Sequence, residues 1–384
     1  MKKICVLTAT RAEYGLLKRM IRKLQQEECF DVRVVVTGAH LSPEFGLTFK
    51  EIEEDGIAID EKIEILLSSD SPAAISKSMG LAMIGFADYF QGLKPDMLVV
   101  LGDRYETLAV CCAAMNQNIP IAHLYGGETT EGAVDEAIRH AITKMSYLHF
   151  TSTEVYRKRV VQLGEDPNRV FNVGSLGVEN VLNEELLTKK ELEECLDWKL
   201  DKLYAVVTFH PVTLENATSQ IQISELLKAV EENPQYQYLF TKANADSDGR
   251  IINQLIDVFV KEHENCRAYH SLGMIKYLSA VKYASFVMGN SSSGIIEVPS
   301  FNIPTINIGE RQKGRIQADS VMNCDASCRE IDQCIKSVKN DVSNGAINPY
   351  QKVNTASIIM ETLQKCLKKD GISIKKKFYD LEGF

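Results

Sequence analysis

The stretch MLVVLGDRYET, residues 97–107, decides the fold, because an apolar run ends at Gly102 and Asp103 and Arg104 follow at once. A strand that is apolar along its whole length is buried on both faces, as in a parallel sheet covered by helices. Four similar runs occur in the first half: ICVLT (4–8), VRVVVTG (32–38), IAHLYGG (121–127) and YLHFTS (147–152). Helix-like stretches separate these runs, which indicates a doubly wound α/β domain with ligands at the carboxyl ends of its strands.

A second set of runs follows the charged segment TKKELEECLDWKLDK (188–202), in which Thr188 suits the N-cap of a short helix. These runs are YAVVTFHP (204–211), YQYLFTKAN (236–244), SFVMGNSSSG (285–294) and IPTINIGER (303–311). We therefore expect two Rossmann-like domains, residues 1–185 and 186–365, and a tail, residues 366–384. A final helix is expected around residues 351–368, and we hypothesise that it packs back on the first domain. Two such domains facing a central cleft suit a ligand with two dissimilar halves, such as a nucleotide sugar.

Composition narrows the class of protein. The 384 residues exceed the roughly 250–300 at which one core stops growing, which also favours two domains. The chain is 45% hydrophobic and 25% charged, with no uncharged apolar stretch of about 18 residues. Its start, MKKICVLTAT, lacks the long apolar core of a signal peptide, so we expect a cytoplasmic protein. A formal net charge of −9 argues against a nucleic-acid surface.

Cysteine and histidine spacing predicts neither a metal site nor a redox motif. The ten cysteines include no CxxC pair, and the seven histidines include no HExxH. The segment TATRAEYG (8–15) lacks the GxGxxG fingerprint of dinucleotide-binding folds. We expect reduced thiols and no cofactor.

Three cationic or acidic residues follow strands of the first half. Arg11 lies where a strand gives way to a helix, so its charge and the free helix amides can meet a phosphate together. The alternative for Arg11 is an exposed arginine at a helix start. Asp103 and Arg104 lie at a strand's carboxyl end, and the alternative for Asp103 is a helix cap.

The densest group of titratable residues lies in HLYGGETTEGAVDEAIRHAITK (123–144): His123, Glu128, Glu131, Asp135, Glu136, Arg139 and His140. Carboxylates held together raise one another's pKa, which makes a base able to act near neutral pH. Asp135 and Arg139 are four residues apart, and an exposed helical ion pair is the alternative for those two. The pair Gly126 and Gly127 favours close approach of a ligand.

Two motifs of the second half carry candidate residues. His210 in FHPVT ends a buried strand, where a structural histidine is the alternative. In GNSSSGIIEVPSFNIPTINIGER (289–311), a serine and glycine turn precedes a helix whose amides and hydroxyls can hold a diphosphate. The candidates there are Ser291, Ser292, Gly294, Glu297, which can accept both ribose hydroxyls, and Arg311. A simple N-cap is the alternative for the serines.

Taken in order, TATRAEYG, LGDRYETLA, the GGE…DEAIRHAITK stretch, FHPVT and GNSSSGIIEVPSF resemble the hydrolysing UDP-N-acetylglucosamine 2-epimerases of sialic and legionaminic acid synthesis. The match runs from about residue 4 to residue 315. The resemblance implies glycosyltransferase-B architecture. The non-hydrolysing 2-epimerases begin with a GTRPE-type loop that this chain lacks.

The resemblance also implies a mechanism. A carboxylate removes the proton from sugar carbon 2, UDP departs from carbon 1, and the resulting glycal is hydrated to give the free manno sugar. By motif position, Asp103 and Asp135 match catalytic carboxylates and His210 matches the active-site histidine. Residues that match nucleotide contacts or suit the departing UDP are Arg11, Arg104, Asn244, Ser291, Ser292, Glu297 and Arg311. No cofactor is implied.

The loop after the paired glycines departs from the family pattern. In the animal branch a catalytic glutamate directly precedes the glycines, whereas Tyr125 occupies that position here. We assign the role to Glu128, with Glu131 second, and expect Tyr125 to contact the sugar. Gly15 replaces a serine of the animal motif.

Three alternatives accompany this prediction. One is the same reaction on UDP-2,4-diacetamido-2,4,6-trideoxyglucose, the second is a glycosyltransferase of the same fold, and the third is an inactive nucleotide-sugar sensor. The crowded carboxylates favour proton abstraction over sugar transfer, and retention of Asp103, Asp135 and His210 argues against the sensor. We expect a homodimer or homotetramer with no nucleic-acid or membrane partner.

Overall fold

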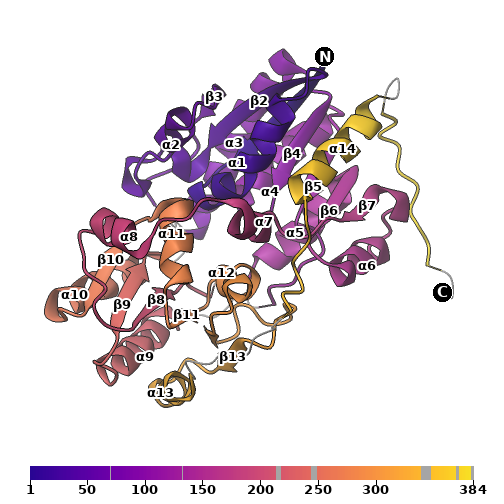
Figure 1. Ribbon diagram of the computed structural model, residues 1–384. Helices are drawn as coiled ribbons and strands as arrows, with labels where there is room; N and C mark the ends of the chain where they lie inside the picture. Colours follow the sequence, from indigo (N-terminus) through magenta and orange to yellow (C-terminus); the bar gives the residue numbers. More distant parts are fainter. Residues whose placement is uncertain are drawn as a thin grey trace. The chain divides into compact units, whose positions relative to one another are not determined.

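The computed structural model describes residues 1–69, 71–131, 133–212, 218–243, 249–338, 347–368 and 372–381. It divides into two compact units, each containing one parallel sheet (Figure 1). Unit 1 comprises Met1–Glu128, Asp135–Glu179 and Lys352–Phe384, and unit 2 comprises Thr129–Val134 and Asn180–Gln351. Among the described residues, no helix is long and apolar enough to cross a membrane.

Unit 1 contains a seven-stranded sheet in the order β3-β2-β1-β4-β5-β6-β7. Its strands are β1 (Lys2–Thr8), β2 (Phe30–Thr37), β3 (Ile59–Ile63), β4 (Met97–Leu101), β5 (Ile121–Leu124), β6 (Leu148–Thr151) and β7 (Val170–Asn172). Its helices are α1 (Arg11–Gln25), α2 (Phe49–Glu54), α3 (Pro72–Leu93), α4 (Tyr105–Asn116), α5 (Asp135–Met145), α6 (Glu154–Gln162) and α14 (Thr355–Leu367), with short 3-10 turns η1 (Gly38–Leu41), η2 (Pro43–Phe45) and η3 (Pro167–Arg169). Helix α7 (Leu176–Asn183) carries the chain from unit 1 into unit 2.

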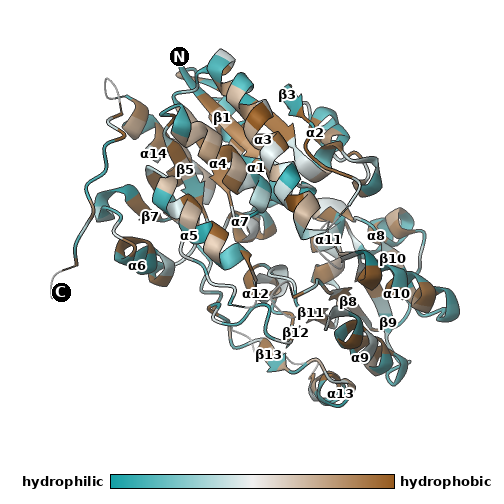
Figure 2. Ribbon diagram, turned by 180° about the vertical axis from the view of Figure 1, so that it is seen from behind, coloured by the Kyte–Doolittle hydropathy of each residue, from teal (hydrophilic) through white to brown (hydrophobic). Residues whose placement is uncertain are grey.

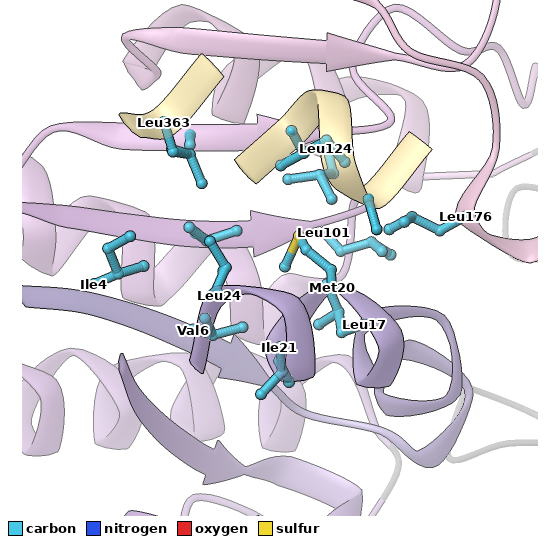
Figure 3. Packing of buried hydrophobic residues seen from close by; sticks show 14 of the residues in the cluster. Ile4, Val6, Leu17, Met20, Ile21, Leu24, Leu101, Leu124, Leu176 and Leu363 are labelled. Carbon is cyan, nitrogen blue, oxygen red and sulfur yellow. The ribbon is translucent and has the colours of Figure 1, made fainter. Parts of the chain in front are cut away.

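Both faces of this sheet are buried. Ile4 and Val6 of β1 pack with α1 and α14 on one face, as Figure 3 shows for the side chains around Met20 and Leu363. The intervening Cys5 and Leu7 pack with α3 and α4 on the other face. In Figure 2 the central strands of unit 1 are accordingly brown, whereas the surrounding helices carry both colours. The predicted doubly wound arrangement is confirmed.

The chain divides at different points from those that the sequence suggested. It enters unit 2 after Glu179 rather than after residue 185, and residues 352 onward belong to unit 1. The reason is the apolar face of α14, whose Ile359 and Leu363 are fully buried in the core around α1. The hypothesis that the last helix packs back on the first domain is thus confirmed.

Unit 2 contains a six-stranded sheet in the order β10-β9-β8-β11-β12-β13. Its strands are β8 (Tyr204–Thr208), β9 (Gln237–Thr241), β10 (Cys266–Tyr269), β11 (Phe286–Gly289), β12 (Thr305–Ile308) and β13 (Val321–Cys324). Its helices are α8 (Lys189–Leu196), α9 (Ser219–Glu231), α10 (Gly249–Glu262), α11 (Gly273–Lys282), α12 (Ser293–Ile296) and α13 (Cys328–Ser337), with η4 (Val298–Phe301). Thr188 caps α8 as predicted, in a capping box with Glu191.

Candidate active site

Strand order locates the ligand-binding edge of unit 1. Strands β1 and β4 are neighbours in the sheet. From β1 the chain adds strands on one side, to β3, and from β4 it adds strands on the other side, to β7. At such a switch point the loops leaving the two strands diverge and leave room for a ligand at their carboxyl ends. Arg11 follows β1 and Asp103 and Arg104 follow β4, so the fold brings these three predicted residues to one edge.

The turn after β1 is held by its own capping box. Thr10 accepts a hydrogen bond from the Glu13 amide at 3.3 Å, and Glu13 Oε2 accepts from the Ala9 and Thr10 amides at 2.7 and 3.3 Å. Glu13 is buried, and Glu13 Oε1 has no hydrogen-bond partner among the described residues. Burial raises the pKa of Glu13 to about 7, although the Arg104 charge opposes the shift.

Arg11 begins α1 directly beyond this turn. The side chain is half-buried rather than fully exposed, and its Nη1 has no hydrogen-bond partner within the described residues. Burial lowers the pKa of Arg11, with the Glu51 charge acting in the opposite direction. A half-buried guanidinium with donor capacity at a switch point favours the anion-binding alternative for Arg11.

Arg104 lies beside a buried carboxylate. Its Nε and Nη2 each donate to Glu106 at 3.2 Å, and the Glu106 side chain is 1% exposed whereas that of Arg104 is 15% exposed. Glu106 therefore binds the edge of the Arg104 guanidinium that carries Nε and Nη2. Neither Glu106 nor Glu13 was singled out in the sequence, because each reads as an ordinary acidic residue in the first turn of a helix.

Asp103 is fixed by Arg139, which comes from helix α5. The Asp103 carboxylate accepts a hydrogen bond from Arg139 Nη2, and Arg139 Nη1 donates to Glu136 at 2.9 Å and to the Glu128 carbonyl at 2.8 Å. The Arg139 side chain is 1% exposed, and that of Asp103 is 23% exposed. One buried guanidinium thus ties together the β4 loop, the glycine-rich loop and α5.

This arrangement decides between alternatives left open by the sequence. The residue at the N-cap of α4 is Arg104, and Asp103 is engaged by Arg139, so the helix-cap reading of Asp103 is wrong. The exposed ion pair proposed as the alternative for Arg139 is wrong as well, because Arg139 is buried. A helical position alone does not reveal burial, since the partner of Arg139 lies 36 residues away in sequence.

Other residues of the predicted acid cluster lie on α5 with Arg139 or bond to it. His140 Nε2 lies 3.1 Å from Glu136 Oε1, and Asp135 begins the same helix and is half-buried. Glu128 is buried, and its Oε1 accepts a hydrogen bond from Ser152 Oγ at 2.6 Å. Of the two candidate glutamates, Glu128 therefore belongs to the Arg139 cluster of unit 1.

Glu131, the second candidate for the catalytic glutamate, belongs to unit 2. It is exposed, its amide donates to the Lys313 carbonyl at 3.5 Å, and its carboxylate lies beside Gly314. Its structural setting thus differs from that of Glu128.

His123 has a supporting role. It is fully buried on β5, and its Nε2 donates to the Gly102 carbonyl at 2.8 Å while its Nδ1 lies 3.3 Å from Thr143 Oγ1. Since a carbonyl only accepts, Nε2 carries the proton. Burial lowers the pKa of His123 to about 3, so the ring is neutral and holds the turn that precedes Asp103.

The paired glycines pack closely against other parts of the chain. Gly127 has a φ of +77°, and a Cβ there would lie 2.4 Å from the Tyr156 carbonyl oxygen of α6. A Cβ on Gly126 would lie 3.0 Å from Thr143 Oγ1. Packing of protein atoms therefore requires glycine at both positions, and close approach of a ligand there stays a prediction.

Tyr125 also has a φ in the left-handed region, +69°. Its hydroxyl accepts from the Leu176 amide at 2.9 Å and lies 3.1 Å from Ser175 Oγ, and the residue is 8% exposed. The phenol thus anchors the start of α7. A contact between Tyr125 and the sugar stays a prediction.

Unit 2 has its own switch point, between β8 and β11. His210 follows β8, and Asn290 follows β11 and is fully buried. The Asn290 side chain makes two hydrogen bonds to the backbone of His210, and we call this pair the Asn290 clamp. Oδ1 accepts from the His210 amide at 2.7 Å, and Nδ2 donates to the His210 carbonyl at 2.7 Å. Asn290 lies in the motif GNSSSG but was not among the predicted site residues.

Close strand approach requires glycine at the end of β11. Gly289 has a φ of +130°, and a Cβ there would lie 1.9 Å from the Thr208 carbonyl oxygen. Gly294 likewise packs on Thr305, whose methyl group would lie 2.9 Å from an added Cβ and whose hydroxyl donates to the Gly294 carbonyl at 2.6 Å. Packing on Thr305 therefore requires glycine at position 294. A contact between Gly294 and the substrate stays a prediction.

The other predicted nucleotide residues of unit 2 surround this turn. Ser291, Ser292 and Glu297 are half-buried in and after the turn that begins α12. Arg311 Nη1 donates to the Asn290 carbonyl at 3.2 Å, so the turn after β11 and the loop after β12 meet. Asn244 lies outside the described residues. Among the described residues, no group of three or more His, Cys, Asp or Glu side chains is arranged to hold a metal ion.

The sequence profile of the UDP-N-acetylglucosamine 2-epimerase family matches residues 22–364. The chain belongs to this family. The family that the ordered motifs predicted is thus confirmed. The predictions of an enzyme and of two parallel-sheet α/β domains are confirmed as well.

Among relatives of this 2-epimerase, a Campylobacter jejuni GDP/UDP-N,N'-diacetylbacillosamine 2-epimerase (hydrolyzing) is 46% identical over 340 residues, covering 88% of each chain. An Escherichia coli polysialic acid biosynthesis protein P7 is 41% identical, covering 99% of this chain and 98% of its own. A Legionella pneumophila UDP-N,N'-diacetylbacillosamine 2-epimerase (hydrolyzing) is 32% identical, covering 95% and 99%.

The fold of this 2-epimerase also matches solved structures. The Methanocaldococcus jannaschii UDP-GlcNAc 2-epimerase in complex with UDP-GlcNAc and UDP has a TM-score of 0.80 at 19% identity, covering 95% of this chain and 100% of its own. The likeness supports the fold.

Proposed function

We propose that this enzyme hydrolyses and epimerises a UDP-N-acetylglucosamine-type sugar, giving UDP and the free manno sugar. Family membership supports the reaction class, and two relatives whose names include "hydrolyzing" support release of the nucleotide. The observation that carries the assignment is the Asp103 carboxylate at the switch point of unit 1, held by the buried Arg139.

The proposed chemistry divides between charge and proton transfer. A carbon-2 proton is weakly acidic, so its removal must be coupled to departure of a good leaving group. A carboxylate of the Asp103, Glu128 and Asp135 cluster takes the proton, while cations stabilise the leaving UDP. Arg11 and Arg104 supply that positive charge in unit 1, and Arg311 with the Ser291 and Ser292 amides supplies donors in unit 2.

His210 is the proposed acid or phosphate contact. The Asn290 side chain fixes the His210 backbone at both its amide and its carbonyl, which limits where the imidazole can point. Such fixing is what proton transfer to a leaving group or an intermediate requires.

The first test offers two substrates to the purified enzyme, UDP-N-acetylglucosamine and UDP-N,N'-diacetylbacillosamine, the sugar in the names of two relatives. UDP release and the configuration of the free sugar are measured for each. We expect UDP and a free manno sugar from at least one of them. Transfer of the sugar to an acceptor, with no free manno product, would favour the glycosyltransferase alternative instead.

Asp103→Asn tests the catalytic cluster. We expect kcat to fall by about 10²- to 10⁴-fold, because the variant keeps the shape and one acceptor for Arg139 but loses the carboxylate. Calorimetry should give nearly the wild-type affinity for UDP. Glu154→Gln, which alters an exposed ion pair on α6, is the matched control and should keep full activity. Unchanged kcat in Asp103→Asn would remove Asp103 from the reaction.

Assembly into a homodimer or homotetramer and residence in the cytoplasm stay predictions of the sequence. Light scattering on the purified protein checks the first.

A further inference from the structure

The segment formed by residues 372–381, which follows α14, contacts the rest of unit 1 at several points. The Tyr379 amide donates to the Gly164 carbonyl at 3.0 Å, and the Phe378 ring occupies the space that Gly164 leaves, since a Cβ there would lie 2.2 Å from the ring. Leu381 packs on the small apolar cluster of α6 and β7: Val160, Val161 and Val170. The segment is therefore docked rather than lying free of the domain.

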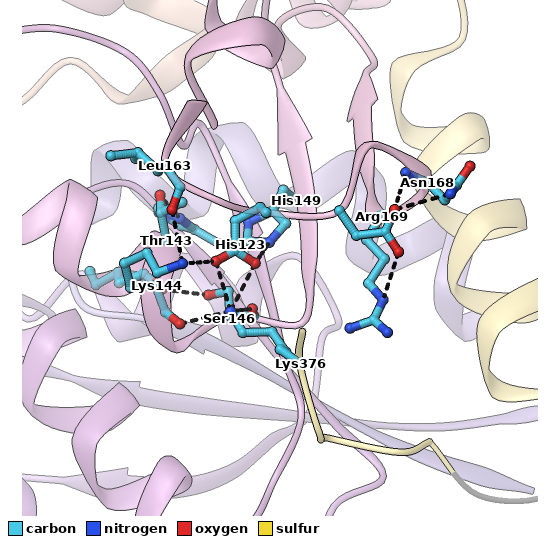
Figure 4. Close-up of polar contacts among 12 residues, drawn as sticks. His123, Thr143, Lys144, Ser146, His149, Leu163, Asn168, Arg169 and Lys376 are labelled. Atoms are coloured by element: carbon cyan, nitrogen blue, oxygen red, sulfur yellow. Dashed lines mark hydrogen bonds and ion pairs between the residues drawn. The ribbon is translucent and has the colours of Figure 1, made fainter. Parts of the chain in front are cut away.

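Lys376 is the polar centre of this docking. Its Nζ donates to both carboxylate oxygens of Glu165 at 2.8 and 2.9 Å, and to the carbonyls of Lys144 and Ser146 at 2.7 Å each (Figure 4). Its side chain is 23% exposed. Lys375 and Lys377, on either side, are exposed.

Glu165 joins this lysine to two further groups. It also accepts from Lys144 Nζ at 2.6 Å and lies 3.1 Å from His149 Nε2, and its side chain is 2% exposed. Burial alone would raise the pKa of Glu165, but hydrogen bonds from His149, Lys144 and Lys376 outweigh burial and lower it to about 2. The buried, ionised Glu165 carboxylate is therefore stabilised by Lys144 and Lys376.

The carbonyls bound by Lys376 lie at the carboxyl end of α5. The last carbonyls of a helix have no partner within the helix, and a cation there is favoured by both hydrogen bonding and the helix dipole. The other end of α5 follows residues 129–134, which belong to unit 2, so Lys376 acts at the end of the helix from which the chain continues within unit 1. The same helix carries Asp135, Arg139 and His140.

A second path leads from Glu165 through the sheet to the Asp103 loop. His149 on β6 is paired in register with His123 on β5, and His123 donates to the Gly102 carbonyl. Glu165 thus contacts α5 through Lys144 and β6 through His149. Helix α5 carries Arg139, and β6 pairs with β5, whose His123 holds the Gly102 carbonyl next to Asp103.

We propose that Lys376, acting with Glu165, is a positioning residue for the reaction: it fixes the carboxyl end of α5 and so places Arg139 and Asp135 relative to Asp103. Lys376 itself does not touch the substrate. The proposal rests on the proposed function for the catalytic role of the cluster, whereas the fixing of α5 is independent of that function.

The test compares Lys376→Met, Lys376→Arg and Lys375→Met with the wild type. Hydrogen exchange is followed in α5 and, as an internal reference, in β1, while kcat, KM and UDP affinity are measured separately. In Lys376→Met we expect exchange in α5 to rise with β1 unchanged, kcat to fall by about tenfold, and UDP affinity to stay within twofold. Lys376→Arg should recover most of the lost kcat, and Lys375→Met should match the wild type.

Three results would overturn the proposal: α5 exchange in Lys376→Met equal to that in Lys375→Met, a rise in α5 exchange with no loss of kcat, or equal rises in α5 and β1. If the wild type releases UDP from neither sugar, the proposed function fails instead, and the exchange comparison alone decides whether Lys376 holds α5.

Discussion

At the scale of single residues, Arg139 governs how Asp103 can be altered. A buried guanidinium is tolerated only with its acceptors in place, and removal of one partner of such a pair costs about 3–5 kcal/mol. Asp103 and Glu136 are the carboxylates that satisfy it. For this reason an isosteric Asp103→Asn change separates catalysis from stability better than Asp103→Ala does.

Glu13 makes stability depend on pH in a predictable direction. Its folded-state pKa, about 7, lies above the ordinary value of 4.5, so folding favours the protonated acid. The stability that this provides is fully present below about pH 4.5 and is lost as the pH rises through 7. Glu13→Gln removes the titration and keeps a neutral side chain of the same shape.

We therefore expect the free energy of unfolding of the wild type to fall, between pH 5 and pH 8, by about 2–3 kcal/mol more than that of Glu13→Gln. Urea unfolding followed by circular dichroism at both pH values measures the difference. Parallel pH dependence of the two proteins would show that Glu13 is ionised in the folded state at pH 5.

At the scale of elements, the loops of unit 1 depend on close backbone packing. Gly127 combines a positive φ with a position at which an added Cβ would clash with the Tyr156 carbonyl of α6. We expect Gly127→Ala to lower the free energy of unfolding by at least about 2 kcal/mol, because the alanine is strained and the helix must move.

Gly80→Ala is the matched control. Gly80 lies inside α3, and an added Cβ would meet nothing within 4 Å. Alanine there should raise the free energy of unfolding by about 0.5–1 kcal/mol. Urea titration of both variants checks the pair, and equal effects at the two sites would refute the packing role of Gly127.

The Asn290 clamp joins the loop after β8 to the loop after β11 in unit 2. Asn290→Ala leaves the His210 amide and carbonyl without the partners that they have now, so we expect a loss of about 2–4 kcal/mol in unit 2 and a lower kcat. Trp198, the single tryptophan, belongs to unit 2 and reports its unfolding by fluorescence. The exposed Gln220→Ala serves as control, and an equally stable Asn290→Ala would mean that water replaces the clamp.

At the scale of the whole molecule, the sequence predicts the inner strands well and the edges poorly. The strands without a predicted apolar run are β3, β7, β10 and β13, which are the outermost strands of the two sheets. An edge strand lacks a neighbour on one side and is partly exposed, so IDEKI of β3 reads as a polar segment. The inner strands, buried on both faces, read as apolar runs.

The candidate site was likewise predictable where strand order alone places a residue, and not where a distant partner does. Residues that follow inner strands, such as Asp103 and His210, were found because parallel strands present their carboxyl ends together. Burial of Arg139 and the clamp by Asn290 were missed, since each depends on a partner distant in the sequence: Asp103 for Arg139 and His210 for Asn290. The return of residues 352–384 to unit 1 was likewise set by packing on α1.

In the proposed reaction, a carboxylate of the Asp103 cluster abstracts the carbon-2 proton as UDP leaves. Turnover in heavy water, with the product examined by mass spectrometry and NMR, tests it most directly. We expect one UDP released for each sugar and one deuterium at carbon 2 of the free manno product. UDP release with protium retained at carbon 2 would contradict it.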